Sequence, residues 1–387
     1  MLELITNADV YAPRSLGIKN LVVCAGKIVE ICDYVPLLDD RLDIVHTDLD
    51  GARVVPGFID AHAHIIGGGG EAGPSTRVPP LHLSQFTTAG VTSVVGLLGT
   101  DDLTRTPQSL LTQVMGLREE GLSAWCYTGG YHVPATTLTH SVRSDIVNLE
   151  PVIGVGEVAI SDHRSSQPTT DEILRLVSEA HVAGLMTGKA GLVHFHLGDG
   201  ERGLAMIRDC LDQSELPARS FNPTHVNRNK PLFEEACELT KRGCTIDLTA
   251  FPSDEDALGW SAEQAVERYF DQGFDPEKLT ISSDGGGCLP AFNAQGELTK
   301  MGFAKSSAMA VTFKAMLGMG IPMEKALPLM TSNVAKLLKF HAKGRLAVGF
   351  DADLLVLDDV HGMSSVMANG IWHVRQGQTL IRGLFED

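Results

Sequence analysis

The sequence predicts an α/β protein built on a (β/α)8 barrel of the TIM type, with a small β-sandwich domain formed by both termini. Segments with helical periodicity separate eight short apolar runs, as expected for βα units. Both ends of the chain carry short strand-like runs without helices between them. The eight apolar runs lie at 54–59, 91–98, 123–131, 152–160, 191–197, 220–226, 244–250 and 278–284.

The predicted helices support the barrel. The clearest covers 170–183, where apolar residues recur at helical spacing after a Thr-Thr-Asp start. In such a barrel the functional residues lie at the carboxyl ends of the strands. The remaining helical segments lie at 102–120, 201–214, 231–242, 262–272 and 304–339.

The terminal runs predict the second domain, because runs broken by turn residues such as Ala25-Gly26 fit an antiparallel arrangement. We therefore expect a β-sandwich domain of 1–53 plus 343–387 and a hydrolase barrel of 54–342. The terminal runs lie at 2–5, 20–24, 27–32, 43–48, 349–358, 365–369, 370–375 and 378–382.

Composition narrows the function classes. The 387 residues include 31 basic and 48 acidic side chains, a net charge of −17. Nucleic acid and anionic membranes are thus excluded as expected partners, because phosphate binding needs a basic surface. Seven cysteines without a CxxC motif indicate reduced thiols, and no basic leader or membrane-length apolar run is present. We expect a cytoplasmic enzyme with a small-molecule substrate.

Polar residues close most of the predicted strands. The run VVPGFIDAHAH (54–64) ends on two histidines one residue apart, which face the same side of a strand and suit a divalent metal. A glycine run and Glu71 follow. The candidate metal ligands are His62, His64, Glu157, His196, His225 and Asp284.

Each candidate ligand also has a structural interpretation. An HxH pair alone is about as often two polar residues at the end of a strand as it is two metal ligands. Either His194 or His196 could be a hydrogen-bonded core histidine. His225 could cap a turn, and Asp284 could be a turn aspartate. The convergence of these residues at strand ends favours a metal site.

Longer motifs resemble the isoaspartyl (β-aspartyl) dipeptidases of the amidohydrolase superfamily, and the similarity extends over nearly the whole chain. The superfamily shares the HxH pair and the aspartate but not the loop sequences. The motifs are HIIGGGGEAGP (64–74), VTSVVGLLGT (91–100), YHVP (131–134), ISDHR (160–164), THVNRN (224–229), SSDG (282–285) and DADL (351–354).

The sequence departs from that family at the fourth strand. There the best-known members carry a lysine whose carbamate bridges two zinc ions, whereas this chain has Glu157 after one extra residue. A carboxylate has the same two bridging oxygens, and a bulge would bring its shorter side chain closer. The alternative is a single-metal site without a bridge. Lys189 precedes strand 5 and is expected on the wrong side of the barrel.

The resemblance implies two zinc ions per chain, bridged by Glu157 and a hydroxide that acts as the nucleophile. His62, His64 and Asp284 would hold one ion, and His196 and His225 the other. Asp284 would also act as general base and acid, taking the hydroxide proton and passing it to the leaving amine. A large homo-oligomer, such as an octamer, is suggested by the same resemblance.

The implied reaction is hydrolysis of the β-aspartyl bond of dipeptides. Glu71 suits the substrate ammonium, Arg164 and Arg228 suit its carboxylates, and Tyr131 could donate to the oxyanion. The expected catalytic residues are thus Asp284, Tyr131 and Glu71. Each arginine could instead form a surface ion pair. The expected substrate-binding residues are Gly69, Glu71, Thr100, Tyr131, Arg164, Arg228 and Cys288, the last of which replaces a family serine.

Two other functions fit parts of the sequence. Another amidohydrolase, such as a hydantoinase-like or dihydroorotase-like cyclic amidase or an N-acyl amino acid deacylase, would share the fold. The neutral ring of a cyclic amide substrate would leave Glu71, Arg164 and Arg228 unpaired. A non-catalytic barrel used for assembly would have lost metal ligands, but this chain keeps every expected type.

Overall fold

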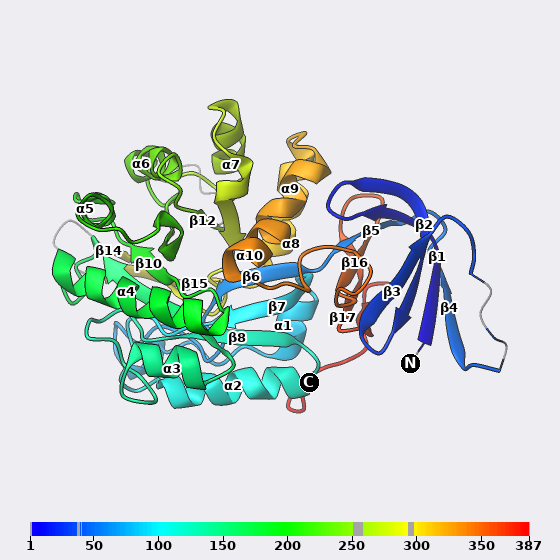
Figure 1. Ribbon diagram of the computed structural model, residues 1–387, viewed down its shortest axis with the longest axis horizontal. Helices are drawn as coiled ribbons and strands as arrows, with labels where there is room; N and C mark the ends of the chain where they lie inside the picture. The colour runs from blue at the N-terminus through cyan, green and yellow to red at the C-terminus, as the bar shows by residue number, and fades with distance from the viewer. Residues whose placement is uncertain (1, 37–38, 40, 251–257, 293–297, 387) are drawn as a thin grey trace.

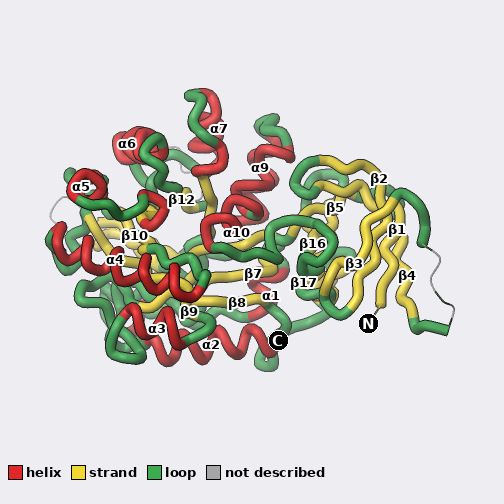
Figure 2. The backbone as a smooth tube through the Cα atoms, in the orientation of Figure 1, coloured by secondary structure: helices red, strands yellow, loops and turns green. Residues whose placement is uncertain are grey.

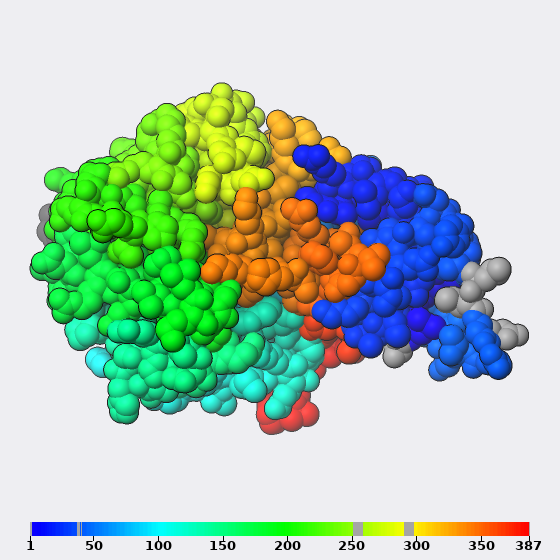
Figure 3. All heavy atoms as spheres, viewed as in Figure 1, coloured from blue at the N-terminus to red at the C-terminus, as the bar shows by residue number. Residues whose placement is uncertain are grey.

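The computed structural model describes residues 2–36, 39, 41–250, 258–292 and 298–386. Figure 1 shows two lobes, one rich in helices and one formed by strands from both ends of the chain. The segment that contains α10 lies on the surface between the lobes in Figure 3.

The helical lobe is built on parallel strands. Six of them form one sheet in the order β11-β10-β9-β8-β7-β6, and β12 pairs with β13. Backbone hydrogen bonds join β6 to the chain after β13, from Asp284 N to His62 O (3.0 Å) and from His64 N to Gly285 O (2.8 Å). These eight strands are β6 (Phe58–Ala63), β7 (Val91–Gly96), β8 (Ser123–Thr128), β9 (Val152–Ile160), β10 (Val193–Leu197), β11 (Phe221–Thr224), β12 (Ile246–Thr249) and β13 (Leu279–Ser282).

Helices cover the outside of these strands, as Figure 2 shows. The longest, α4, begins with a capping box of Thr169 and Glu172 and buries one apolar face. The helices are α1 (Leu83–Thr87), α2 (Pro107–Glu119), α3 (Val142–Asn148), α4 (Thr170–Thr187), α5 (Ala205–Gln213), α6 (Lys230–Thr240), α7 (Ala262–Asp271), α8 (Ala308–Gly318), α9 (Met323–Met330) and α10 (Ser332–Leu338), with short 3-10 turns at Pro74–Thr76, Ala218–Ser220 and Pro276–Lys278.

The predicted helix 304–339 is in fact three helices, α8, α9 and α10. Gly320 adopts a positive φ of 86°, and Pro322 follows before α9 begins. Thr331 then has non-helical dihedral angles between α9 and α10. Glycine in the left-handed region and proline both end a helix locally, so the long periodic pattern does not form one helix.

The terminal strands form one mixed sheet with its own core. Its strand order is β19-β18-β17-β16-β5-β1-β2-β3, with β4 paired to β1. Buried side chains such as Ile5, Leu21, Ile28 and Leu354 form this core. The strands are β1 (Leu2–Tyr11), β2 (Ser15–Cys24), β3 (Lys27–Cys32), β4 (Ile44–Asp48), β5 (Arg53–Pro56), β16 (Leu354–Leu357), β17 (Met363–Ala368), β18 (Ile371–Arg375) and β19 (Gln378–Thr379).

The predicted strand 54–59 belongs to both lobes. Its first part, β5, pairs with β16 and β1 in the terminal sheet, and its second part begins β6. The two parts meet at Gly57, where a Cβ would lie 2.2 Å from Thr92 Oγ1. Only a glycine allows the chain to pass this close to β7 as it enters the parallel sheet.

Candidate active site

Six buried side chains meet at the carboxyl ends of the parallel strands. His62 is the next-to-last residue of β6, and His64 directly follows this strand. Glu157 lies within β9, and His196 lies within β10. His225 follows β11 and Asp284 follows β13. None of the six residues is more than 6% exposed. The predicted convergence of these residues is therefore present in the structure.

Two groups of these side chains could hold a metal ion. One contains His62, His64 and Asp284, and the other contains His62, Glu157 and His225, with the ligand atoms of each group within 4.8 Å of one another. Asp284 Oδ1 lies 3.3 Å from His62 Nε2 and 3.2 Å from His64 Nε2. Imidazole and carboxylate at this spacing are a ligand set that zinc accepts.

Glu157 belongs to the second group and also contacts His64 of the first. Its Oε1 lies 3.3 Å from His64 Nε2, and its Oε2 lies 3.0 Å from His196 Nδ1 and 3.2 Å from His225 Nε2. A Cβ on Gly99 would lie only 2.7 Å from His64 and 3.3 Å from Glu157. The chain after β7 therefore reaches the site only because residue 99 is glycine.

A bulge in β9 places Glu157. Val155 pairs with Val193 and Val158 pairs with Phe195, so β9 advances three residues while β10 advances two. The extra residue expected from the sequence is thus present beside Glu157. Lys189 lies elsewhere, because its Nζ donates to the carbonyls of Ile146 and Leu149, which precede β9.

Two of the histidines, His62 and His225, have the hydrogen bonding of metal ligands. His62 Nδ1 lies 2.9 Å from His194 Nε2, and His225 Nδ1 lies 2.7 Å from Thr249 Oγ1. By contrast, His62 Nε2 and Asp284 Oδ1 are buried and lack a hydrogen-bond partner within the described part of the chain. A metal ion requires a ligand imidazole in which a hydrogen bond fixes one ring nitrogen and the other nitrogen faces the metal site. These residues therefore fit a metal centre.

Electrostatics favour a cation at this point. Burial alone would raise the pKa of Glu157, but His62 and His196 hold it well below its ordinary value. Burial alone would lower the pKa of His64, but Asp284 and Glu157 raise it to about 10. The two carboxylates therefore stay ionised in a buried site, and such charges need positive partners.

Backbone strain accompanies two of these side chains. His225 has φ of 60° and Asp284 has φ of 54°, both in the left-handed region that non-glycine residues seldom adopt. A Cβ on Gly287 would lie 2.1 Å from Asp284 Oδ1, so the turn after β13 also depends on glycine. Strain of this kind persists where the surroundings fix the conformation, as at functional sites.

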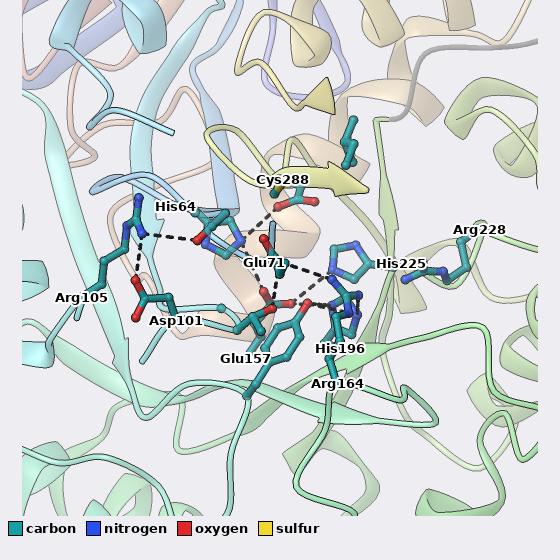
Figure 4. Close-up of a pocket in the computed structure, with 17 residues that line it drawn as sticks. His64, Glu71, Asp101, Arg105, Glu157, Arg164, His196, His225, Arg228 and Cys288 are labelled. Carbon is teal, nitrogen blue, oxygen red and sulfur yellow. Dashed lines mark hydrogen bonds and ion pairs between the residues drawn. The ribbon is translucent and has the colours of Figure 1, made fainter. Parts of the chain in front are cut away.

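A pocket opens onto this cluster, and Figure 4 shows its lining side chains. All seven residues predicted to bind substrate line it, together with His64, Glu157, His196, His225 and Asp284. His62 lies beneath, fully buried. The seven are Gly69, Glu71, Thr100, Tyr131, Arg164, Arg228 and Cys288.

Charged groups of both signs face this pocket. Arg164 Nη1 lies 3.5 Å from Glu71 Oε1, which also accepts a hydrogen bond from Thr100 Oγ1 (3.1 Å). Tyr131 lies three residues beyond the end of β8 rather than on the strand, and its hydroxyl is 2.9 Å from His196 Nδ1. The pocket can therefore contact an ammonium and a carboxylate close to the metal-binding cluster.

The second predicted arginine lies at the rim of the pocket. Arg228 pairs with Asp199 through Nε (2.9 Å) and Nη2 (3.0 Å), and its Nη1 donates to Leu197 O (2.6 Å). Cys288 lies on β14 (Cys288–Phe292), which pairs antiparallel with β15 (Leu298–Phe303). Burial and the Glu71 carboxylate raise the pKa of the Cys288 thiol to about 12, so it is a neutral group at the pocket wall.

Sequence reasoning missed three residues of this site. Asp101 and Arg105 also line the pocket, and Arg105 donates to the carbonyls of Gly69 and Val78. Arg105 thus braces the glycine loop, a role that no local pattern in its segment indicates. Asp162 was part of the quoted ISDHR motif but received no role, and it contacts both His196 and Arg164.

Comparisons with known proteins give the family. Residues 53–378 match the Amidohydrolase family. The chain belongs to the amidohydrolase family. This amidohydrolase is 39% identical to a β-aspartyl dipeptidase from Fervidobacterium islandicum AW-1, solved in complex with a β-Asp-Leu dipeptide. The superposition covers 98% of each chain with a TM-score of 0.92. A second structure of a β-aspartyl dipeptidase from that organism is 38% identical, with full coverage of both chains and a TM-score of 0.91.

This amidohydrolase also has more distant relatives. An imidazolonepropionase from a Ruegeria species is 24% identical over 81% of this chain and 80% of its own. A D-hydantoinase structure is 16% identical with a TM-score of 0.70, covering 100% of this chain and 98% of the hydantoinase. Within the described residues, no helix of this amidohydrolase is long and apolar enough to cross a membrane.

Proposed function

We propose that this amidohydrolase is a zinc-dependent dipeptidase that hydrolyses the β-aspartyl (isoaspartyl) peptide bond. The observation that carries the proposal is one pocket that combines a His-Glu-Asp cluster with Glu71, Arg164 and Arg228. A relative at 39% identity binds β-Asp-Leu, a dipeptide with one ammonium and two carboxylates that these three side chains match.

Two metal ions fit the cluster. His62, His64 and Asp284 would hold one, and His196 and His225 the other, with Glu157 shared between them. The Glu157 carboxylate, already in contact with His64, His196 and His225, supports this sharing. Two bound zinc ions supply a water of lowered pKa and polarisation of the scissile carbonyl.

The side chains around the cluster orient the substrate. Glu71 binds the α-ammonium, Arg164 binds the carboxylate of the aspartyl residue, and Arg228 binds the carboxylate of the leaving amino acid. Arg164 already lies beside Glu71, so the substrate's own charges replace this contact when it binds. Gly69 and Thr100 line the same wall and supply backbone or hydroxyl contacts, as does the thiol of Cys288.

Two residues act on the reacting atoms. Tyr131 donates its hydroxyl hydrogen to the oxygen that develops negative charge, because burial keeps the pKa of this phenol well above its ordinary value. Asp284 accepts the proton of the attacking water and delivers it to the leaving amine. Its carboxylate is ionised in the free site, because the imidazoles of His62 and His64 outweigh burial and lower its pKa.

The proposal extends to the architecture. The eight parallel strands, joined between β6 and β13, form one (β/α)8 barrel of residues 54–342. The nine-stranded terminal sheet curls around its own core into a sandwich-like domain of 1–53 plus 343–387, to which β5 adds residues up to Pro56. A homo-oligomer remains a prediction from the resemblance.

The test is hydrolysis of β-Asp-Leu beside α-Asp-Leu by zinc-reconstituted protein, with a chelator-treated control. The proposal predicts cleavage of the β-linked dipeptide alone, lost with chelator and restored by zinc. Protein that retains two zinc ions but cleaves neither dipeptide would contradict the proposed substrate. Cleavage of a hydantoin by that protein would support the cyclic amidase alternative instead.

A further inference from the structure

We propose that Asp162 is a positioning residue whose carboxylate holds a metal-ligating imidazole and a substrate-binding guanidinium in one arrangement. The imidazole belongs to His196 and the guanidinium to Arg164, so the roles of these two residues rest on the proposed function. Asp162 lies two residues beyond β9, on the strand that also carries Glu157.

The contacts of Asp162 use both of its oxygens. Oδ1 accepts from the backbone N (2.7 Å) and Nε (3.0 Å) of Arg164, and Oδ2 accepts from Nη2 of the same arginine (2.7 Å). Oδ2 also lies 3.1 Å from His196 Nε2. The Asp162 carboxylate therefore accepts hydrogen bonds from one edge of the Arg164 guanidinium and also contacts the imidazole of His196.

The environment of Asp162 leaves this carboxylate little freedom. Asp162 is 7% exposed. A Cβ added to Gly198, at the end of β10, would lie 2.4 Å from the Asp162 Cβ, so the backbone packs closely here. The Asp162 carbonyl accepts from Ser165 N (3.1 Å) and Gln167 Nε2 (2.8 Å). The position of the carboxylate is thus set by the fold rather than by a flexible loop.

The contact with His196 decides which imidazole nitrogen faces the cluster. The His196 ring lies between two carboxylates, with Nε2 3.1 Å from Asp162 Oδ2 and Nδ1 3.0 Å from Glu157 Oε2. Arg164 Nη2 also lies 3.3 Å from Nε2, and the Tyr131 hydroxyl lies 2.9 Å from Nδ1. Because a carboxylate oxygen only accepts, a hydrogen that Asp162 holds on Nε2 leaves Nδ1 as the nitrogen that would offer a lone pair to a metal ion beside Glu157. Carboxylates that orient ligand imidazoles in this way typically contribute 10–100-fold to metal affinity.

The contact with Arg164 decides which part of the guanidinium faces the substrate. Asp162 occupies Nε and Nη2, whereas Nη1 points at Glu71 Oε1 at 3.5 Å. Figure 4 shows Arg164 beside His196 and Glu71. When Glu71 binds the substrate ammonium, Arg164 Nη1 can bind the substrate carboxylate. The hydrogen bonds of Arg164 with Asp162 remain in place.

The test compares Asp162→Asn with wild type in two measurements, zinc affinity by competition with a chelator and KM for β-Asp-Leu at saturating zinc. The proposal predicts a zinc affinity about 10–100-fold lower. It also predicts a KM about tenfold higher, because one side of a charged hydrogen-bonded pair is lost. Circular dichroism checks folding, and Asp162→Ser, held to the same outcomes, replaces the asparagine variant if that protein does not fold.

Two further variants separate the contributions. Asp199→Asn is the matched control, because Asp199 pairs with the other arginine, Arg228, and is expected to leave zinc affinity unchanged. Arg164→Met should raise KM without changing zinc affinity. Wild-type zinc affinity in Asp162→Asn, or a KM that recovers fully at saturating zinc, would overturn the proposal. Wild-type protein that binds no zinc would overturn the proposed function itself.

Discussion

Asp284 is placed for both of the tasks that we propose for it, metal binding and proton transfer. Its carboxylate lies 3.3 and 3.2 Å from His62 and His64, and its backbone has a positive φ of 54°. The same side chain lines the substrate pocket. It therefore both contacts the metal-binding cluster and reaches the space where a scissile bond would lie, which is the geometry of a proton shuttle.

Replacement of this residue tests that role. We expect Asp284→Ala to lower kcat for β-Asp-Leu at least ~100-fold, since general acid–base groups contribute about 10²–10⁴-fold. The parallel strands should remain folded, as judged by circular dichroism. A folded alanine variant with wild-type kcat would rule out proton transfer through Asp284.

Glu71 offers a second test at the scale of one residue. We expect Glu71→Gln to raise KM for β-Asp-Leu about tenfold or more, because the substrate ammonium loses a charged acceptor. The matched control is N-acetyl-β-Asp-Leu, which has no ammonium, so the substitution should hardly change its binding as a competitive inhibitor. Equal losses for both dipeptides would show that Glu71 acts on another part of the substrate.

At the residue scale, the ligand types could be predicted from the sequence because the histidines and acids follow apolar runs directly. His62 and His64 follow one such run, and Glu157 stands at an extra residue whose bulge the β9–β10 register contains. Arg105 and Asp162 could not be given roles in this way. Their contacts join loops that are distant in sequence, and local periodicity does not predict such contacts.

At the scale of elements, the buried strands were the most predictable part of the fold. A parallel strand covered on both faces is an apolar run that a sequence shows directly. The pairing of β5 with β16 was not predictable, since it brings residues 53–56 to 354–357. The division of 304–339 into three helices depends on the local conformations of Gly320 and Thr331, which the helical periodicity of the segment conceals.

Strand β18 carries an unusual histidine that predicts a pH effect on stability. His373 is fully buried, and neither ring nitrogen has a hydrogen-bond partner within the described ranges. Burial lowers its pKa in the folded state. Below pH ~6.5 the unfolded chain therefore binds a proton that the folded chain does not, and stability falls as pH falls.

We expect His373→Leu to stabilise the protein, with an advantage over wild type that grows as pH falls. The gain should be about 1–3 kcal/mol, the usual cost of an unsatisfied buried polar group. Urea unfolding at about pH 7.5 and about pH 5.5 measures it. His341→Leu is the control, since His341 is exposed. A pH-independent difference between His373→Leu and wild type would show that the pKa of His373 is the same in the folded and unfolded chain, against this prediction.

At the scale of the whole molecule, the fold brings the ends of five strands to one point. His62, Glu157, His196, His225 and Asp284 span more than 200 positions of the sequence, yet their side chains surround one small space. Separate βα units supply the ligands, so the site forms only when the parallel strands have assembled. Metal binding is therefore expected to stabilise the folded chain.

In the active site that we propose, two zinc ions share Glu157, which replaces a carbamylated lysine. The most direct measurement is the zinc content per chain of desalted, zinc-loaded protein prepared in carbon dioxide-depleted buffer. We predict two zinc ions in wild type and in Glu238→Gln, an exposed position on α6. Glu157→Gln should retain about one, because a neutral amide bridges poorly. One zinc ion in wild type, or two in Glu157→Gln, would contradict the account.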